Sequence, residues 1–182
     1  MSFRRHGNSG FTLTELMLTI AVLGTIVAIG LPVMTDITAA TKLSEASRTV
    51  EREFQSARLK AVSSNRVLRV RTNCPAAGYI RTVELLGTAA DTASNRCVQT
   101  AYPFPPPDTE ITTRPNLDGP VRTIPNNATV SDVVLQFAPD GTVTQVVGGV
   151  PTVIAAPVTV TVTRQSKSKS MTVNNIGKIQ LQ

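Results

Sequence analysis

The stretch GNSGFTLTELMLTIAVLGTIVAIGLPVMTD, residues 7–36, decides the fold of this chain. One carboxylate, Glu15, stands near the start of this stretch. Within residues 7–36, Asp36 is the next charged residue after it. The 19 uncharged residues from Leu16 to Met34 would form a helix of about 28 Å, close to the thickness of a bilayer's hydrocarbon core. The stretch therefore predicts a membrane-spanning helix with one carboxylate near its end, where a charge is costly and usually functional.

The residues before the apolar run distinguish it from an ordinary secretory signal. Residues 1–10 form a short polar leader with Arg4, Arg5 and His6, and the small residue Gly10 precedes the apolar core. A secretory signal instead has its small-residue cleavage site after the core. The positive-inside rule keeps the two arginines in the cytoplasm and places the rest of the chain across the membrane. Hydropathy alone also fits a plain one-pass anchor.

The sequence GFTLTELM, residues 10–17, resembles the type III signal of type IV pilins and type II secretion pseudopilins. In that family a peptidase cuts after the Gly, the new N-terminal residue is methylated, and a Glu follows at the fifth position of the mature chain. The resemblance assigns these three roles to Gly10, Phe11 and Glu15. Pro32 stands where many pilins have a helix-bending proline, and it should kink or locally melt the helix.

The resemblance also implies a role for Glu15 in assembly. In a filament of this family the apolar helices pack into a central bundle, where a buried carboxylate needs a partner. The α-amino group of Phe11 in a neighbouring subunit is a cation of the right reach, so Glu15 would set the axial register between subunits. The alternative is a carboxylate that snorkels to the membrane edge, which leaves the Gly10–Phe11 junction unexplained.

The composition of the rest of the chain fits one globular domain of modest size. Trp is absent and aromatic residues are few, so the core should consist of Val, Ile, Leu and Ala. The two cysteines, Cys74 and Cys97, fall in the part expected outside the cytoplasm. The sequence therefore predicts a disulfide between them, and two free thiols are the alternative.

Helical spacing continues beyond the apolar run, so that one helix is expected from about Phe11 to Ser63. Its second part should pack an apolar stripe on a sheet, formed by Leu43, Ala46, Ser47, Val50, Phe54, Ala57 and Ala61. The expected organisation is a cleaved leader at 1–10, a transmembrane and assembly helix at 11–35, its amphipathic continuation at 36–63 and a β-rich domain at 64–182.

After residue 63 the pattern changes from helical to alternating, which indicates strands. Strands are predicted at residues 66–72, 79–86, 132–138, 142–147, 157–164, 170–174 and 178–182. Residues 103–125 hold seven of the twelve prolines and predict a long loop, with extended segments or short edge strands. The predicted fold class is therefore α+β, with a long N-terminal pilin helix packed on an antiparallel β domain.

Three local matches narrow the resemblance to the H-type minor pseudopilins, the group of GspH-like and FimT-like proteins. Residues 54–70, FQSARLKAVSSNRVLRV, resemble that group's helix end and first strand. LQFAPDGTVT at 135–144 resembles its F-x-x-x-G hairpin, and VNNIGKIQLQ at 173–182 resembles its closing strands. The segment from about residue 87 to 127, rich in proline and containing Cys97, has no counterpart in that group.

The function implied by this resemblance is structural. The chain would be a minor pilin or pseudopilin that joins the tip or initiation complex of a type IV pilus or a type II secretion pseudopilus. It would lie in the bacterial inner membrane with its globular domain in the periplasm. Its partners would be other pilin subunits, the prepilin peptidase and the inner membrane. No catalytic residue, cofactor or metal is expected, because His6 is the only histidine and no metal-ligand cluster or phosphate-binding glycine loop is present.

DNA binding during natural transformation is the alternative function. No acidic residue follows Asp140, and a local charge of +4, which could attract phosphates, comes from Arg164, Lys167, Lys169 and Lys178. However, the DNA-binding FimT-like members carry a Gly-Arg-x-Arg closing motif. Here Gly177 is followed by Lys, Ile and Gln, so the second basic residue is missing. The other interpretation is a basic face that keeps the domain soluble.

Overall fold

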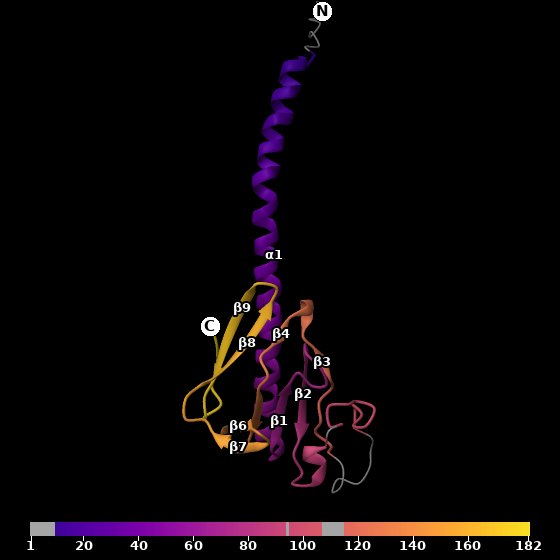
Figure 1. Cartoon of the computed structure of the whole chain (residues 1–182), viewed down its shortest axis with the longest axis vertical. Coiled ribbons are helices and arrows are strands. Elements are labelled where there is room, and N and C mark those ends of the chain that lie inside the picture. The colour runs from indigo at the N-terminus through magenta and orange to yellow at the C-terminus, as the bar shows by residue number, and fades with distance from the viewer. Residues whose placement is uncertain (1–9, 94, 107–114) are drawn as a thin grey trace, which may run out of the picture. The chain divides into compact units, whose positions relative to one another are not determined.

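The computed structural model describes residues 10–93, 95–106 and 115–182, and it divides into two compact units, Met1–Ala39 and Ala40–Gln182. Helix α1, Leu13–Ser64, contributes to both units (Figure 1). Its bounds differ from the predicted helix by one or two residues.

The backbone of the first unit is helical from Leu13 onward, and it stays helical at Pro32. Of the two outcomes expected at Pro32, local melting is therefore not observed. A proline removes one backbone donor, while the neighbouring turns keep their own hydrogen bonds. A kink at Pro32 stays a prediction, which continuity of the helix does not test.

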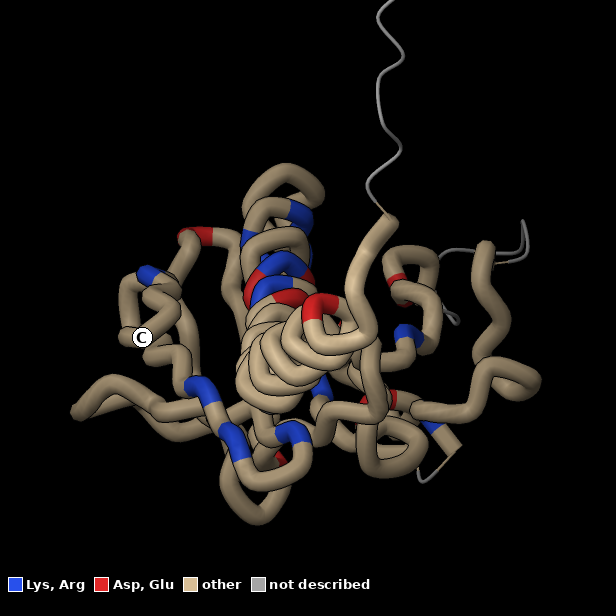
Figure 2. The backbone as a smooth tube through the Cα atoms, turned by 90° about the horizontal axis from the view of Figure 1, so that it is seen from above, with Lys and Arg blue, Asp and Glu red and all other residues tan. Residues whose placement is uncertain are grey.

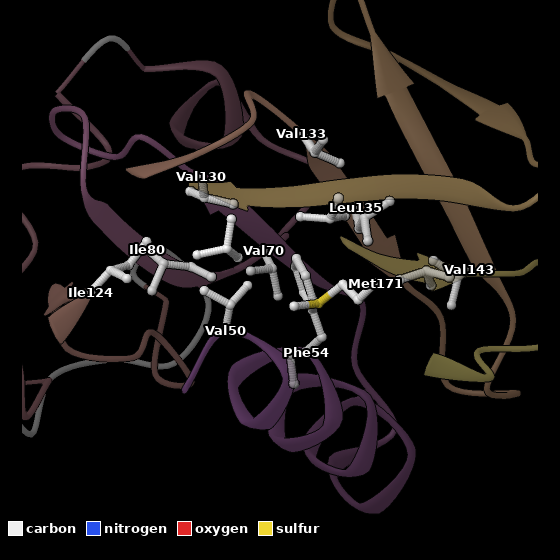
Figure 3. Packing of buried hydrophobic residues seen from close by; sticks show 14 of the residues in the cluster. Val50, Phe54, Val70, Ile80, Ile124, Val130, Val133, Leu135, Val143 and Met171 are labelled. Atoms are coloured by element: carbon white, nitrogen blue, oxygen red, sulfur yellow. The ribbon is translucent and has the colours of Figure 1, made fainter. Parts of the chain in front are cut away.

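In the second unit, α1 buries one face against the sheets. All seven residues of the predicted stripe are at most 4% exposed, from Leu43 to Ala61. Val50 and Phe54 point toward Val70 and Met171 of the sheets (Figure 3). The ring centroids of Phe54 and Phe137 lie 6.4 Å apart. Because each fully buried Val or Phe contributes about 1.5–3 kcal/mol, this stripe accounts for the packing of the helix on the domain.

The described strands form two antiparallel sheets. The larger sheet has the order β3-β2-β1-β5-β6-β7, with β1 Leu68–Thr72, β2 Tyr79–Glu84, β3 Arg122–Thr123, β5 Val134–Phe137, β6 Val143–Val147 and β7 Val150–Val153. The smaller sheet has the order β10-β9-β8-β4, with β4 Thr129–Val130, β8 Val158–Arg164, β9 Lys167–Val173 and β10 Ile179–Leu181. Short 3₁₀ helices occupy Ala89–Thr92 and Pro125–Asn127.

Seven of these strands fall on the seven predicted segments: β1, β2, β5, β6, β8, β9 and β10. Strand β9 begins at Lys167, three residues before the predicted start, because it pairs with β8 through a turn that contains Gln165 at φ 55°. Strand β3 is a short edge strand within the predicted long loop. Strands β4 and β7 were not predicted.

Arg58 of α1 lies between two turns that connect the strands. Its Nη2 donates a hydrogen bond to the Ile176 carbonyl at 3.0 Å, and its Nε lies 3.5 Å from the Gly141 carbonyl. The two turns also meet directly, since the Val143 amide donates to the Asn175 carbonyl at 2.8 Å. The predicted F-x-x-x-G hairpin and the predicted closing hairpin are therefore joined at one arginine of the helix.

Candidate processing and assembly site

The predicted cleavage junction lies outside regular secondary structure. Gly10, Phe11 and Thr12 precede the first residue of α1, and the Phe11 side chain is 78% exposed. An enzyme that cuts a chain needs an accessible segment that is not held in a helix. The Gly10–Phe11 bond meets that requirement.

Thr12 is the N-cap of α1, and Glu15 is the third residue of the helix. The Thr12 Oγ1 accepts a hydrogen bond from the Glu15 amide at 3.3 Å, and the Thr12 carbonyl accepts one from the Leu16 amide at 3.1 Å. A Thr-x-x-Glu sequence at a helix start is the capping-box pattern. In the structure Glu15 takes part through its backbone amide, and the sequence pattern makes helix capping a second candidate role for its side chain, in addition to the assembly role that the sequence suggested.

The charge of Glu15 has no cationic partner among the described residues, since none of the ion pairs there includes it. Its position in the first turn is favourable, because the N-terminal end of a helix stabilises negative charge. In an apolar environment that effect alone leaves the carboxylate without a counter-ion. The chemistry of this site therefore fits a cation supplied by another chain.

The helix that follows Glu15 presents apolar side chains on every face. Its most apolar 18-residue window has a mean hydropathy of 2.4, and none of that window is buried. Two threonines within the run bond back to the helix, with Thr19 Oγ1 donating to the Leu16 carbonyl and Thr25 Oγ1 to the Val22 carbonyl, both at 2.8 Å. A membrane-spanning helix must satisfy its polar groups internally in this way. The first unit therefore has the properties of a membrane anchor.

The predicted disulfide between Cys74 and Cys97 is confirmed, with the two Cα atoms 5.2 Å apart. Cys74 follows β1 and is 2% exposed. Cys97 belongs to the segment without a counterpart in the H-type group. The disulfide therefore ties that segment to the central strand region.

A buried ionic cluster reinforces the disulfide. The side chains of Arg81, Arg96 and Asp118 are at most 1% exposed. Arg96 Nη1 lies 2.8 Å from Asp118 Oδ2, and Arg96 Nη2 donates to Asp118 Oδ1 at 2.8 Å. Arg81 Nη1 donates to the Arg96 carbonyl at 3.0 Å, and Arg96 stacks over the Tyr102 ring at 4.4 Å. These contacts connect Arg81 of β2 to Arg96 and Asp118, which both lie in the segment between β2 and β3.

Glu84 completes the cluster at the end of β2. Its Oε2 accepts hydrogen bonds from the Asn116 and Leu117 amides at 2.8 and 3.0 Å, and its own amide donates to Asp118 Oδ1 at 2.8 Å. Burial raises the pKa of the Asp118 carboxyl, although this hydrogen bond and the Arg96 charge oppose the shift. Pairing with Arg96 and Arg81 thus opposes the cost of burying Asp118, and the cluster connects Glu84 of β2 to residues 116–118.

Two contacts tie this segment and the adjoining strand β3 to α1. Lys60 Nζ donates to the Leu117 carbonyl at 2.9 Å, and Arg122 Nε lies 2.6 Å from Glu53 Oε1. Burial raises the pKa of Glu53, and the Arg122 charge partly offsets that effect. Residues 85–121, where described, are thus anchored at the disulfide, the ionic cluster and the helix.

The four basic residues considered for DNA contact do not form one patch. Arg164 and Lys167 face each other in the β8–β9 register, and Lys169 is two residues further along β9. Lys178 instead precedes Ile179, which pairs with Val173 at the other end of β9. Strand β9 runs from Lys167 to Val173, so these ends are separated by about 20 Å. Figure 2 marks the Lys and Arg positions in blue, as seen from above.

The buried ionic cluster was not predicted from the sequence. The strand predicted at 79–86 contains Arg81 and Glu84, and no partners were assigned to their charges. The sequence did contain two signals for buried charges. One is the pair of opposite charges in a strand that is otherwise largely apolar, and the other is Arg96 beside Cys97. In the described part of the chain, no group of three or more His, Cys, Asp or Glu side chains could hold a metal ion.

Comparison with known proteins identifies both parts of the chain. Residues 5–31 match the prokaryotic N-terminal methylation motif, and residues 46–177 match the family of the type II transport protein GspH. The structure is similar to two crystal forms of the type IV minor pilin FimU of Pseudomonas aeruginosa. One is 15% identical, with 80% of this chain and 92% of that chain covered and a TM-score of 0.49. The other is 14% identical, with 77% and 92% covered and a TM-score of 0.45. No curated protein sequence matches the chain.

Proposed function

This chain belongs to the GspH family and is a minor pilin or pseudopilin subunit, and we propose that it enters its filament after cleavage and methylation at its N-terminus. The observation that carries this proposal is the methylation motif at residues 5–31, which coincides with an accessible Gly10–Phe11 junction at the start of an exposed apolar helix. A prepilin peptidase would cut that junction, and Phe11 would become the methylated N-terminus.

The apolar helix has two successive roles in this proposal. Before assembly it anchors the subunit in the inner membrane, with the β domain in the periplasm. During assembly it leaves the lipid and packs among the helices of other subunits. Both environments are apolar, so the large apolar side chains that are exposed between Leu16 and Met34, such as Leu23 and Ile29, suit both.

Glu15 would be neutralised by the α-amino group of Phe11 on a neighbouring subunit. Cleavage creates that amine, so the leader prevents the pairing until the subunit has been processed. A buried charge pair requires close geometry to offset its desolvation. For this reason the pair would fix the axial position of one helix relative to the next.

We place the subunit at the tip or initiation complex of a type IV pilus or type II secretion pseudopilus, in keeping with its GspH family. The described residues of the segment 85–121 are tied to the domain by the disulfide and the ionic cluster, and we propose that this surface contacts neighbouring subunits. DNA contact is not part of this proposal, because Lys178 lies apart from the other three basic residues.

The test of this function is filament incorporation of Glu15→Val. The substitution makes the span more apolar, so membrane insertion should be unchanged. The variant should be absent from sheared filaments, in contrast to the wild-type chain. Thr19→Val is the matched control, because it also removes a polar group from the span, and it should be incorporated normally. Normal recovery of Glu15→Val in the filament fraction would contradict the proposed role of Glu15.

A further inference from the structure

Positively charged residues gather at one end of the β domain, beside the part of α1 that follows Ala40. Four residues define this basic end: Lys42, Arg164, Lys167 and Lys169. They come from α1 and from the β8–β9 hairpin, which the fold brings together. Glu45 lies beside this group through its hydrogen bond with Asn126, and four cations against this one carboxylate leave a net positive charge.

The basic end is held together by specific contacts. Arg164 Nε donates to the Asn126 carbonyl at 2.9 Å, and Asn126 Nδ2 donates to the Lys42 carbonyl at 3.2 Å and to Glu45 Oε2 at 2.8 Å. Lys169 Nζ lies 3.3 Å from Ser44 Oγ. The hairpin tip is therefore fixed at the level of Lys42 to Ser44 on the helix.

Chain connectivity places this level near a membrane. Lys42 follows Met34, the last residue of the apolar run, by eight residues, which is about 12 Å of helix. The headgroup layer extends roughly 6 Å beyond the hydrocarbon core on each side. Extended Lys and Arg side chains span much of the remaining distance. Chain length alone therefore allows the basic end to reach the headgroups in a membrane-anchored subunit.

We propose that the basic end binds the phosphates of anionic phospholipid headgroups while the subunit waits in the membrane for assembly. This inference rests on the membrane-anchored state in the proposed function. Anionic headgroups attract basic residues that lie close to a membrane span. The Arg164 guanidinium suits phosphate because it offers several N–H donors in one plane. Binding would restrict the orientation of the β domain before the helix leaves the lipid.

The chain offers a clean spectroscopic probe for this proposal because it contains no Trp. Ser166 is exposed at the hairpin tip between Arg164 and Lys167, so Ser166→Trp gives a single fluorophore there. The full chain is placed in nanodiscs whose phosphatidylcholine carries a headgroup spin label, with or without phosphatidylglycerol. Flotation first verifies insertion, and failure to insert would contradict the membrane anchor itself.

Quenching of the introduced tryptophan by the spin label should increase when phosphatidylglycerol is present and decrease at high salt. Replacing Arg164, Lys167 and Lys169 by Gln should abolish that increase, because each lost charge weakens association about fivefold. Lys178→Gln is the matched control, since Lys178 lies at the other end of β9, and it should leave quenching unchanged. Arg164→Lys keeps the charge and should retain most of the effect, which separates charge from a local folding defect.

Quenching that is independent of phosphatidylglycerol, salt and the three substitutions would overturn the proposal. A second arm adds a short DNA duplex to the zwitterionic nanodiscs. If the duplex changes the tryptophan fluorescence through the same three residues while anionic lipid has no effect, the basic end is a nucleic-acid surface and the lipid proposal is wrong.

Discussion

The Arg58 side chain occupies the space that Gly177 leaves by having no Cβ. Gly177 adopts a φ of +74°, and a Cβ built there would overlap Arg58 and lie 2.8 Å from the Gly141 carbonyl oxygen. Arg58 in turn bonds to the carbonyl of Ile176. Close approach therefore requires glycine at position 177. At Gly141 a Cβ would make only ordinary contact with Arg58, and the positive φ of +84° is what favours glycine there.

Gly177→Ala should lower the free energy of unfolding by more than its backbone conformation alone explains. A left-handed φ costs a non-glycine residue about 1–2 kcal/mol, and the clash with a backbone oxygen adds to that cost because the oxygen cannot move freely. Gly87→Ala is the matched control, since Gly87 has the same φ of +74° and open space around it. Chemical denaturation of both variants measures the difference, and equal losses would show that the close approach at Arg58 carries no energy.

Arg96→Met should destabilise the domain by about 3–5 kcal/mol, because it leaves Asp118 buried without its closest cation. Arg52→Met is the control. Arg52 is exposed on the helix, so its replacement should change stability by less than about 0.5 kcal/mol. Similar unfolding midpoints for the two variants would mean that the buried cluster does not stabilise the segment after β2.

The loss of stability caused by Arg96→Met should also depend on pH. Burial already raises the pKa of Asp118 in the wild-type domain, and loss of Arg96 removes an opposing charge. A carboxyl whose folded pKa lies above its unfolded value favours folding at low pH, and that contribution is lost as pH rises through the folded pKa. The difference between variant and wild type should therefore shrink on acidification. A difference that grows toward acid pH would contradict this origin.

Glu15→Gln separates the two roles of Glu15. Glutamine also serves at the third position of a capping box, so the helix start with Thr12 should be preserved. The charge is lost, and the variant should stay in the membrane and fail to enter filaments, as expected for Glu15→Val. If Glu15→Gln assembles normally while Glu15→Val does not, the residue acts through the helix cap and not through a charge pair.

DNA binding should be weak and independent of sequence. Three neighbouring basic residues, Arg164, Lys167 and Lys169, would give a log-log salt slope of about −2.7 on duplex DNA, because each phosphate contact contributes about −0.9. Few aromatic side chains are present for base stacking, so single strands should bind no better than duplexes. Titration of labelled DNA at two salt concentrations checks this. Binding that persists at high salt, or that is lost in Lys178→Ala, would contradict it.

The helix and most strands could be predicted because their patterns are local. The stripe from Leu43 to Ala61 repeats at helical intervals, and Val158, Val160 and Val162 alternate along one strand, so one short window contains the signal. Strand β7 was missed because Pro151 argues against a strand. At the edge of a sheet a proline is tolerated, because one side of an edge strand makes no backbone hydrogen bonds to a neighbouring strand. Strand β7 lies at such an edge.

Contacts between residues far apart in the sequence could not be predicted in the same way. Arg96 and Asp118 are 22 residues apart, and Arg58 and Ile176 are 118 residues apart. No periodicity connects such pairs, because they meet only after the sheets have formed. The disulfide was predictable because the chain has two cysteines and therefore one intramolecular pairing. The separation of Lys178 from the other three basic residues likewise became clear only from the pairing register of β9.

The central claim is that this subunit is cut and methylated at the start of its apolar helix. Intact-mass analysis and N-terminal peptide sequencing of the protein from its native membrane test that claim most directly. The mature chain should begin at Phe11, and Phe11 should carry a methyl group on its α-nitrogen. A chain that retains residues 1–10, or one that is cut after the apolar run, would contradict the account.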